Sequence, residues 1–232
     1  MSQICQQLHQ LINLQPIHSF PFDNNEIPRN GIYILFEMGE TGHGTNRIVR
    51  IGTHTGRNQL RSRLKQHFIQ ENKDRSIFRK NIGRAILSRD HDPFLAQWEL
   101  DLTTHEAKQK YKNIVDFSKQ KQVEQQVTQY IQNNFRFIVF RVDEKEKRLG
   151  WESKIISTVS LCTECQPSSS WLGKYSPKEK IRQSGLWNVN ELYKRPLEVR
   201  EYNELEKAII SRLLSPVKES SNDDANISIP RK

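Results

Sequence analysis

A run of basic residues between Arg57 and Arg89 has the clearest capacity for chemistry in this 232-residue sequence. It holds seven arginines and three lysines against two acidic residues, a net charge of +8 that accounts for almost the whole +9 of the chain. The planar guanidinium of arginine matches phosphate oxygens bidentately, whereas lysine offers a point charge. A solvated basic face is the alternative interpretation, but the preference for arginine favours a polyanionic partner such as nucleic acid. We expect phosphate contacts from Arg57, Arg61, Lys65, Arg75, Arg79, Lys80 and Arg84.

Two residues inside this run have a spacing that would let them act together. The stretch "NQLRSRLKQHFIQ" carries apolar residues at positions 60, 64 and 68, the stripe of an amphipathic helix. Arg63 and His67 stand four positions apart, so on a helix they share one face and can reach one substrate. A solvent-exposed histidine at the end of a helix is the alternative interpretation of His67.

The segment 31–54, "GIYILFEMGETGHGTNRIVRIGTH", predicts a β-hairpin with unusual side chains. Residues 31–37 and 47–52 form apolar runs typical of strands, and the glycine-rich stretch 38–46 between them predicts a loop. Tyr33 lies in the first strand, and Arg50 immediately precedes Ile51-Gly52 in the second. A purely structural hairpin needs neither side chain, although Tyr33 would also suit a packing role. We interpret the hairpin as a platform for a phosphate, with Arg50 projecting from it.

The remaining elements must position these residues. Helical patterns appear at 3–12, 76–88, 121–135 and 151–161, and "FRFIVFRV" at 135–142 is the best isolated strand signal. The order of strands and helices predicts an α+β fold. We expect an N-terminal helical and extended arm at 1–28, a main domain at 29–200 with inserts at about 90–134 and 155–190, a C-terminal helix at 201–216 and a disordered tail at 217–232.

Composition narrows the class of protein further. The sequence offers neither an apolar run long enough to span a membrane nor a signal-peptide pattern, so no membrane association is expected. Three cysteines are too few for a disulfide framework and favour a reducing cytoplasm. Cys162-x-x-Cys165 lacks the second pair that a structural zinc site usually has, so zinc is not predicted there. An obligate protein partner is not evident, and a homo-oligomer stays open.

Taken in order, these residues resemble the GIY-YIG nuclease superfamily. The resemblance rests on Gly31-Ile32-Tyr33, on Ile51-Gly52 in a second strand, and on Arg63 in "RSRLKQHF", and it covers roughly residues 30–190. It implies a small three-stranded antiparallel sheet flanked by helices. It also implies catalytic roles for Tyr33, Arg63 and Glu152, with Glu152 in "WESKII" as the metal-binding glutamate. His67 matches a position that some restriction enzymes of the family use, and Asn188 in "SGLWNVN" could match a late asparagine.

The sequence departs from the family pattern in its second half-motif. That half-motif reads Arg50-Ile51-Gly52, so an arginine stands where the family has its second tyrosine. The proton acceptor would then be Tyr33, or His67 in its place, and Arg50 would join the catalytic residues. Glu124 in "QVEQQV" competes with Glu152 as the metal ligand, and a helix N-terminal acid is the structural alternative for Glu152.

These observations predict a metal-dependent DNA endonuclease of the restriction or defence type, acting on double-stranded DNA. A carboxylate plus substrate phosphate suits Mg²⁺, or Mn²⁺ in its place. Base reading would come from the two inserts, because phosphate contacts position a protein without reading sequence. Two alternatives remain: a non-catalytic nucleic-acid-binding module that kept the fold, and a structure-specific repair nuclease.

Overall fold

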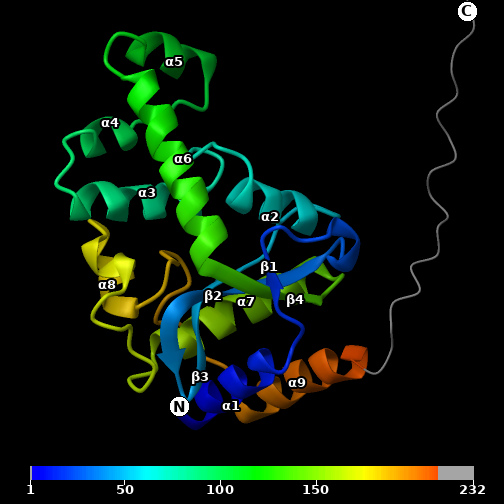
Figure 1. The fold of residues 1–232 in the computed structure, drawn as a ribbon. Coiled ribbons are helices and arrows are strands. Elements are labelled where there is room, and N and C mark those ends of the chain that lie inside the picture. Colours follow the sequence, from blue (N-terminus) through cyan, green and yellow to red (C-terminus); the bar gives the residue numbers. More distant parts are fainter. Residues whose placement is uncertain (1, 214–232) are drawn as a thin grey trace, which may run out of the picture.

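The computed structural model describes residues 2–213 of the chain, with side chains to residue 210. The fold is α+β, as predicted, and its antiparallel sheet has the strand order β1-β4-β2-β3 (Figure 1). The strands are β1 (His18–Ser19), β2 (Gly31–Gly42), β3 (Thr45–Gly52) and β4 (Phe135–Arg141). The expected sheet of three strands was therefore one strand short. β1 has only two residues, too few to give an alternating pattern, and its partner β4 lies more than a hundred positions away.

The hairpin of β2 and β3 is longer than its sequence pattern predicted. The expected loop at 38–46 is mostly strand, and the turn itself is His43-Gly44. Both turn residues have positive φ, 51° and 76°, a region that glycine enters freely and histidine more readily than most residues. The register pairs Tyr33 with Gly52 and Leu35 with Arg50. These pairs fix which side chains share a face.

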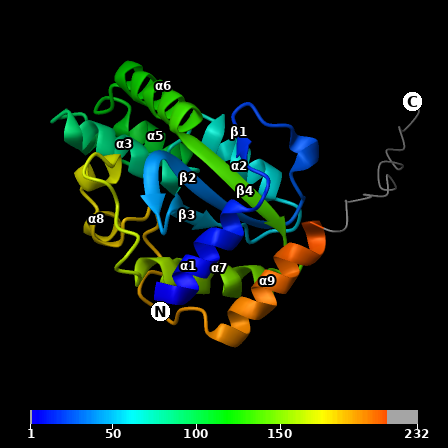
Figure 2. The same ribbon diagram turned by 60° about the horizontal axis from the view of Figure 1, so that its bottom comes forward.

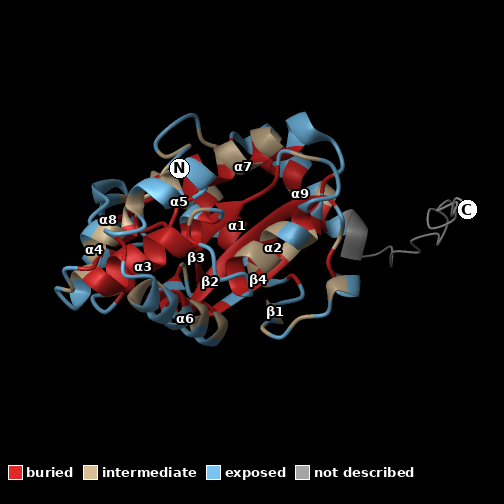
Figure 3. Ribbon diagram, turned by 90° about the horizontal axis from the view of Figure 1, so that it is seen from above, coloured by how far each residue is buried: buried red, intermediate tan, exposed pale blue. Residues whose placement is uncertain are grey.

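Helices cover both faces of the sheet (Figures 1 and 2). One core contains Ile32 and Ile34 of β2, and the other contains Tyr33 and Leu35, because successive strand residues point to opposite faces. Most residues of β2, β3 and β4 are consequently buried (Figure 3). The first core packs α1 (Ser2–Asn13), α7 (Lys145–Ser160) and α9 (Val199–Leu213); the second packs α2 (Leu60–Phe68), α3 (Ile77–Arg89) and α6 (Phe117–Asn134).

The remaining helices extend the second face. α4 (Leu95–Trp98) and α5 (His105–Tyr111) connect α3 to α6, and the Trp98 indole of α4 donates a hydrogen bond to the Lys80 carbonyl. α3 packs against α4, α6 and η2 (Leu172–Tyr175) and is buried along most of its length. The short 3₁₀ turn η1 (Asn24–Glu26) lies in the arm that follows β1.

The segment after β4 differs most from expectation. α7 begins at Lys145, six residues before the predicted start, so Glu152 lies in the middle of a helix and not at its N-terminus. The chain then crosses to the other face through η2 (Leu172–Tyr175) and α8 (Glu179–Ser184). Trp171 and Trp187 are buried in the second core, where both indoles donate to Glu37 Oε2 at 2.8 Å. These tryptophans therefore pack the domain interior.

Two sequence-based expectations concern the C-terminus and the membrane. The predicted tail at 217–232 lies outside the described residues, as do the last three positions of the predicted 201–216 helix. Within residues 2–213, no helix combines the length and the apolar character that crossing a bilayer requires.

Candidate active site

The cross-strand pair Tyr33–Gly52 explains why the tyrosine that ends the first half-motif requires the glycine that ends the second. A Cβ atom at position 52 would lie 2.2 Å from the Tyr33 hydroxyl oxygen, so only glycine lets the phenol ring cross β3. Gly31 is equally constrained, because a Cβ there would lie 2.2 Å from the Phe140 carbonyl oxygen on β4. Gly52 therefore provides the space for the tyrosine ring, and Gly31 permits the close approach of β4 to β2.

A chain of hydrogen bonds runs from Tyr33 into the second core. The Tyr33 hydroxyl and His67 Nε2 are 2.7 Å apart, and His67 Nδ1 lies 2.8 Å from Ser76 Oγ. Ser76 is the N-cap of α3 and accepts from the Arg79 backbone N–H at 3.2 Å. Ser76 was not singled out in the sequence, although a serine before a helical pattern is a recognisable cap signal.

His67 is fully buried, in contrast to the surface alternative considered for it. Its pKa lies well below the ordinary histidine value, first because burial disfavours the charged ring and then because Arg50, Arg63 and Arg79 are close. The ring is therefore neutral near pH 7, and one of its nitrogens can accept a proton.

Arg63 of α2 and Glu152 of α7 line one cavity of about 400 Å³. Thr53 and His54, which follow β3 directly, and Gln66 form part of the same wall. The hydrogen bonds of the Arg63 guanidinium use Nη1, to Gln66 Oε1 at 3.1 Å and to the Arg75 carbonyl at 3.3 Å. Nε is buried without a partner among the described residues, whereas Nη2 is neither hydrogen-bonded to them nor buried. Part of this fork is therefore available to an anion.

Glu152 has one carboxylate oxygen engaged and one available. Its Oε1 accepts a hydrogen bond from the Thr53 backbone N–H at 3.0 Å. Burial raises the pKa of this carboxyl, and the nearby Arg50 guanidinium and the Thr53 N–H oppose that rise. A half-buried carboxylate beside a cavity suits a hard divalent cation, which typically takes one or two carboxylates and completes its shell with water and phosphate.

Arg50 lies inside the protein and not on an open strand face. Its Nη1 donates to the Trp187 carbonyl at 2.9 Å, and its guanidinium stacks over the Phe78 ring at 5.1 Å. Its charge lowers the pKa of both His67 and Glu152. The residue that replaces the motif tyrosine therefore connects the two halves of the site electrostatically.

Asn188 is bound to the sheet edge. Its side-chain Oδ1 accepts from the Ile51 N–H at 3.1 Å and its Nδ2 donates to the Ile51 carbonyl at 2.9 Å. The amide thus satisfies both backbone groups of an edge-strand residue, as a further strand would. This geometry fits a residue that holds β3 in place more than one that contacts substrate.

The alternative metal ligand, Glu124, is enclosed by the protein itself. Its carboxylate forms a 2.7 Å ion pair with Arg79 and accepts from the Lys73 backbone N–H at 2.5 Å. Both side chains of the ion pair are almost completely buried. The carboxylate is consumed by structural contacts, and Glu152 is the better placed of the two glutamates to bind a cation.

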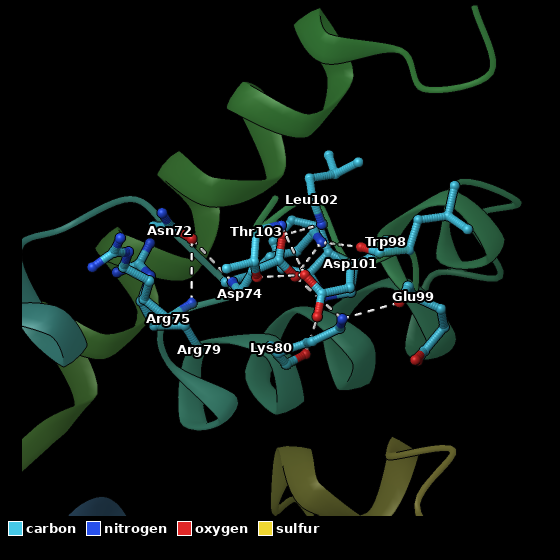
Figure 4. Close-up of polar contacts among 12 residues, drawn as sticks. Asn72, Asp74, Arg75, Arg79, Lys80, Trp98, Glu99, Asp101, Leu102 and Thr103 are labelled. Atoms are coloured by element: carbon cyan, nitrogen blue, oxygen red, sulfur yellow. Dashed lines mark hydrogen bonds and ion pairs between the residues drawn. The ribbon is translucent and has the colours of Figure 1, made fainter. Parts of the chain in front are cut away.

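Three of the seven expected phosphate-binding cations are likewise internal, so the basic run is not one exposed surface. Lys80 contacts Asp74 and the Glu99 carbonyl (Figure 4). Arg84 forms a 2.5 Å ion pair with Glu99. Together with Arg79 they have exposed fractions of 8% or less. Buried, paired cations have no free donors for a phosphate.

The other cations lie at or near the surface. Arg57 and Arg75 are exposed, while Arg61 and Lys65 are half-buried. Arg57 also borders a second cavity of about 580 Å³, which shares Thr55 with the first. Its further basic lining residues, Arg29, Arg141, Lys145 and Arg148, were not singled out in the sequence, because they are spread over three segments.

Comparisons with known proteins identify one family. A family model described as the GIY-YIG domain matches residues 1–213 of the chain, well over half of its length. Comparisons with curated proteins and with solved structures give no match.

Proposed function

The chain belongs to the GIY-YIG domain family, a family of nucleases, and we propose that it is a metal-dependent endonuclease that hydrolyses double-stranded DNA as a restriction or defence enzyme. The observation that carries this proposal is the cavity shared by Arg63 and Glu152. A cation-binding carboxylate and a phosphate-binding guanidinium face one space, which is what phosphodiester hydrolysis requires.

Tyr33 and His67 are suited to move the proton of the attacking water. His67 is neutral at rest, with Nδ1–H donating to Ser76 Oγ, so its unprotonated Nε2 can accept the Tyr33 proton transiently during the reaction. Tyr33 in turn takes the proton that the water loses as its oxygen bonds to phosphorus. Both side chains are fully buried and neither lines the cavity. The Tyr33 hydroxyl lies against Gly52, the residue that precedes Thr53 of the cavity wall, so Tyr33 is the member of the pair that would meet the water.

Charge development at the phosphate is the second requirement. Arg63 would donate to the phosphate oxygens, and a preorganised donor of this kind contributes roughly 10²–10³ in rate. Glu152 would hold Mg²⁺ or Mn²⁺, which when bound supplies Lewis-acid charge neutralisation. Arg50 would act from inside, favouring the ionised form of Glu152 and the neutral form of His67.

The second cavity supports a duplex path beside the site. It adjoins the first at Thr55. Two of its basic lining residues are engaged by the protein, because Arg141 pairs with Asp143 and Arg148 is buried on backbone carbonyls. The exposed cations Arg29, Arg57 and Lys145 remain, against Glu144. Such an excess of cations favours a phosphate backbone. We therefore place the DNA over this surface, with the scissile phosphate at Arg63 and Glu152.

A cleavage assay on supercoiled plasmid tests the proposal. Discrete duplex fragments are expected with Mg²⁺ or Mn²⁺, and none with EDTA. Tyr33→Phe should abolish cutting while leaving DNA binding intact, because only the proton path is lost. Tyr130→Phe is the matched control, since it also removes a hydroxyl that donates to a buried acceptor, Glu37 Oε1.

Other outcomes would overturn particular parts of the proposal. Salt-sensitive binding without cutting of any substrate would identify a binding module. Cutting confined to branched or single-stranded DNA would favour a repair nuclease. Full activity of Tyr33→Phe would remove the tyrosine from the mechanism.

A further inference from the structure

All three cysteines of the chain meet one histidine at the end of the molecule formed by α1 and the β2–β3 turn. Cys5 lies in α1, His43 in the turn, and Cys162 and Cys165 just beyond the end of α7. One ligand atom from each lies within 4.8 Å of all the others. Three segments that are distant in the sequence thus present three thiols and an imidazole to one point.

Two distances within this cluster match the edges of a tetrahedron around a metal. Zn²⁺ binds sulfur at about 2.3 Å and imidazole nitrogen at about 2.0–2.1 Å, so tetrahedral coordination separates two sulfurs by ~3.8 Å and a sulfur from a nitrogen by ~3.5 Å. In the structure, Cys5 Sγ lies 3.8 Å from Cys165 Sγ, and Cys162 Sγ lies 3.4 Å from His43 Nε2. We propose that these four residues form a structural Cys₃His zinc site.

The surroundings of His43 favour metal binding at Nε2. Its side chain is 4% exposed, and its Nδ1 faces Glu164 Oε2 at 3.8 Å. A carboxylate behind the second nitrogen is the usual outer partner of a metal-binding histidine. The neighbouring His9 is occupied differently: its Nδ1 lies 2.9 Å from the Cys5 carbonyl, and its Nε2 accepts from the Ile48 N–H at 3.2 Å. His9 therefore supports the cluster without being a ligand.

A disulfide explains the cluster less well. The Cys5 and Cys165 sulfurs are far beyond the bonded distance of about 2.05 Å, and all three cysteines are free thiols. A disulfide would also leave the third thiol and His43 without a role. A metal ion engages all four side chains at once.

The proposed zinc site differs from the proposed catalytic site in chemistry and in purpose. Soft thiolates select Zn²⁺, whereas the Glu152 carboxylate suits a hard cation. A fully occupied Cys₃His set has no open position for substrate, which is typical of structural zinc. It would fasten α1 and the hairpin turn to the C-terminal end of α7, the helix that carries Glu152. The C-x-x-C pair, to which the sequence alone assigned no metal, would thus provide half of the site.

Metal analysis of the full-length chain, purified without a polyhistidine tag from zinc-supplemented cells, tests the proposal. We expect about one zinc ion per chain after desalting. Replacement by Co²⁺ should give the visible d–d bands of a tetrahedral site and a sulfur-to-cobalt charge-transfer band. Both readouts are independent of nuclease activity.

Two histidine variants distinguish a zinc ligand from a histidine that has a similar backbone conformation but lies outside the proposed site. His43 and His91 both lie in turns with positive φ, 51° and 52°, which asparagine tolerates well. His43→Asn should lose most of the zinc, whereas His91→Asn should retain it. Glu152→Gln should also retain it, even if cleavage is lost, which separates this proposal from the nuclease proposal.

Certain results would overturn the zinc site. A folded wild-type chain that contains no zinc and gives no cobalt spectrum would do so. A mass that shows a native disulfide, or equal zinc content in His43→Asn and His91→Asn, would do so as well. Loss of both zinc and folded structure in Cys162→Ser would support a metal that the fold requires.

Discussion

Two regions of this protein combine an arginine on a shorter helix with a glutamate on a longer one, and they do so in opposite ways. Arg79 of α3 and Glu124 of α6 form a closed ion pair of 2.7 Å with almost no exposure. Arg63 of α2 and Glu152 of α7 instead line a cavity, and the described contacts include no ion pair between them.

The difference distinguishes a structural pair from a pair that can accept ligands. In the closed region, Arg79 also donates to the His67 carbonyl and to Thr128 Oγ1, so its donors are consumed inside the protein. In the open region, each partner keeps unsatisfied capacity facing one space. A phosphate beside Arg63 and a cation beside Glu152 would bind to the groups that have no partner within the protein.

Replacing the two glutamates should have the largest effects: on cleavage at Glu152 and on stability at Glu124. Glu152→Gln removes the anionic ligand and should reduce cleavage by roughly 10²–10³ or more, with little change in stability. Glu124→Gln leaves Arg79 buried without a charge partner and should lower the free energy of unfolding by about 3–5 kcal/mol. Urea unfolding and single-turnover cleavage of folded protein measure the two effects separately. The comparison fails if Glu124→Gln loses activity at unchanged stability, which would move the metal to α6.

Salt dependence of DNA binding should show a smaller contrast between the two regions. Lys65 and Arg75 are at least partly exposed, whereas Lys80 and Arg84 are buried in ion pairs. Lys65→Gln with Arg75→Gln should reduce the slope of log affinity against log salt by about 1.8, at 0.9 per lost phosphate contact. Lys80→Gln with Arg84→Gln is the matched pair of one lysine and one arginine, and its slope should stay near that of the wild type.

Equal reductions of slope in both double variants would show that the buried cations reach the DNA after all. The slope is the informative quantity here, because a partly unfolded variant loses apparent affinity at every salt concentration without losing phosphate contacts. Circular dichroism at the assay temperature identifies that case.

The sequence predicted the elements that depend on local pattern. The helices around Leu64 and Val127 and the strand 135–141 follow from periodic burial over short stretches. β1 was missed because two residues carry no pattern. The start of α7 was predicted too late because Lys145–Gly150 contains one apolar side chain, Leu149, and therefore no apolar stripe. Prediction from hydrophobic periodicity over short stretches gives no information on such segments.

For the site, the sequence supplied residue types but not their environments. Spacing on α2 indicated that Arg63 and His67 act together, but not that Tyr33 is hydrogen-bonded to His67 across the fold. The pairing of Arg84 with Glu99 and the meeting of Cys5 with Cys165 are tertiary contacts between distant segments. A count of charges or cysteines gives the number of such groups in the chain. Only the fold determines which of them remain available to bind a ligand.

His67 lies near the arginines of both regions, Arg63 and Arg79. The effect of its titration on the free energy of unfolding should be the smallest of the predicted effects. Burial first, and then Arg50, Arg63 and Arg79, lower the pKa of the folded-state ring well below 6.5, while the unfolded chain titrates near 6.5. Below pH 6.5 the unfolded state therefore binds a proton that the folded state refuses, and stability falls as pH falls. Between pH 8 and pH 5.5 this one group should cost about 1.4 kcal/mol. Urea unfolding of His67→Gln should show a pH dependence weaker by that amount, whereas the exposed His91→Gln should match the wild type. An unchanged pH dependence in His67→Gln would mean that the folded protein admits the proton, and that the ring beside these three arginines is not held neutral.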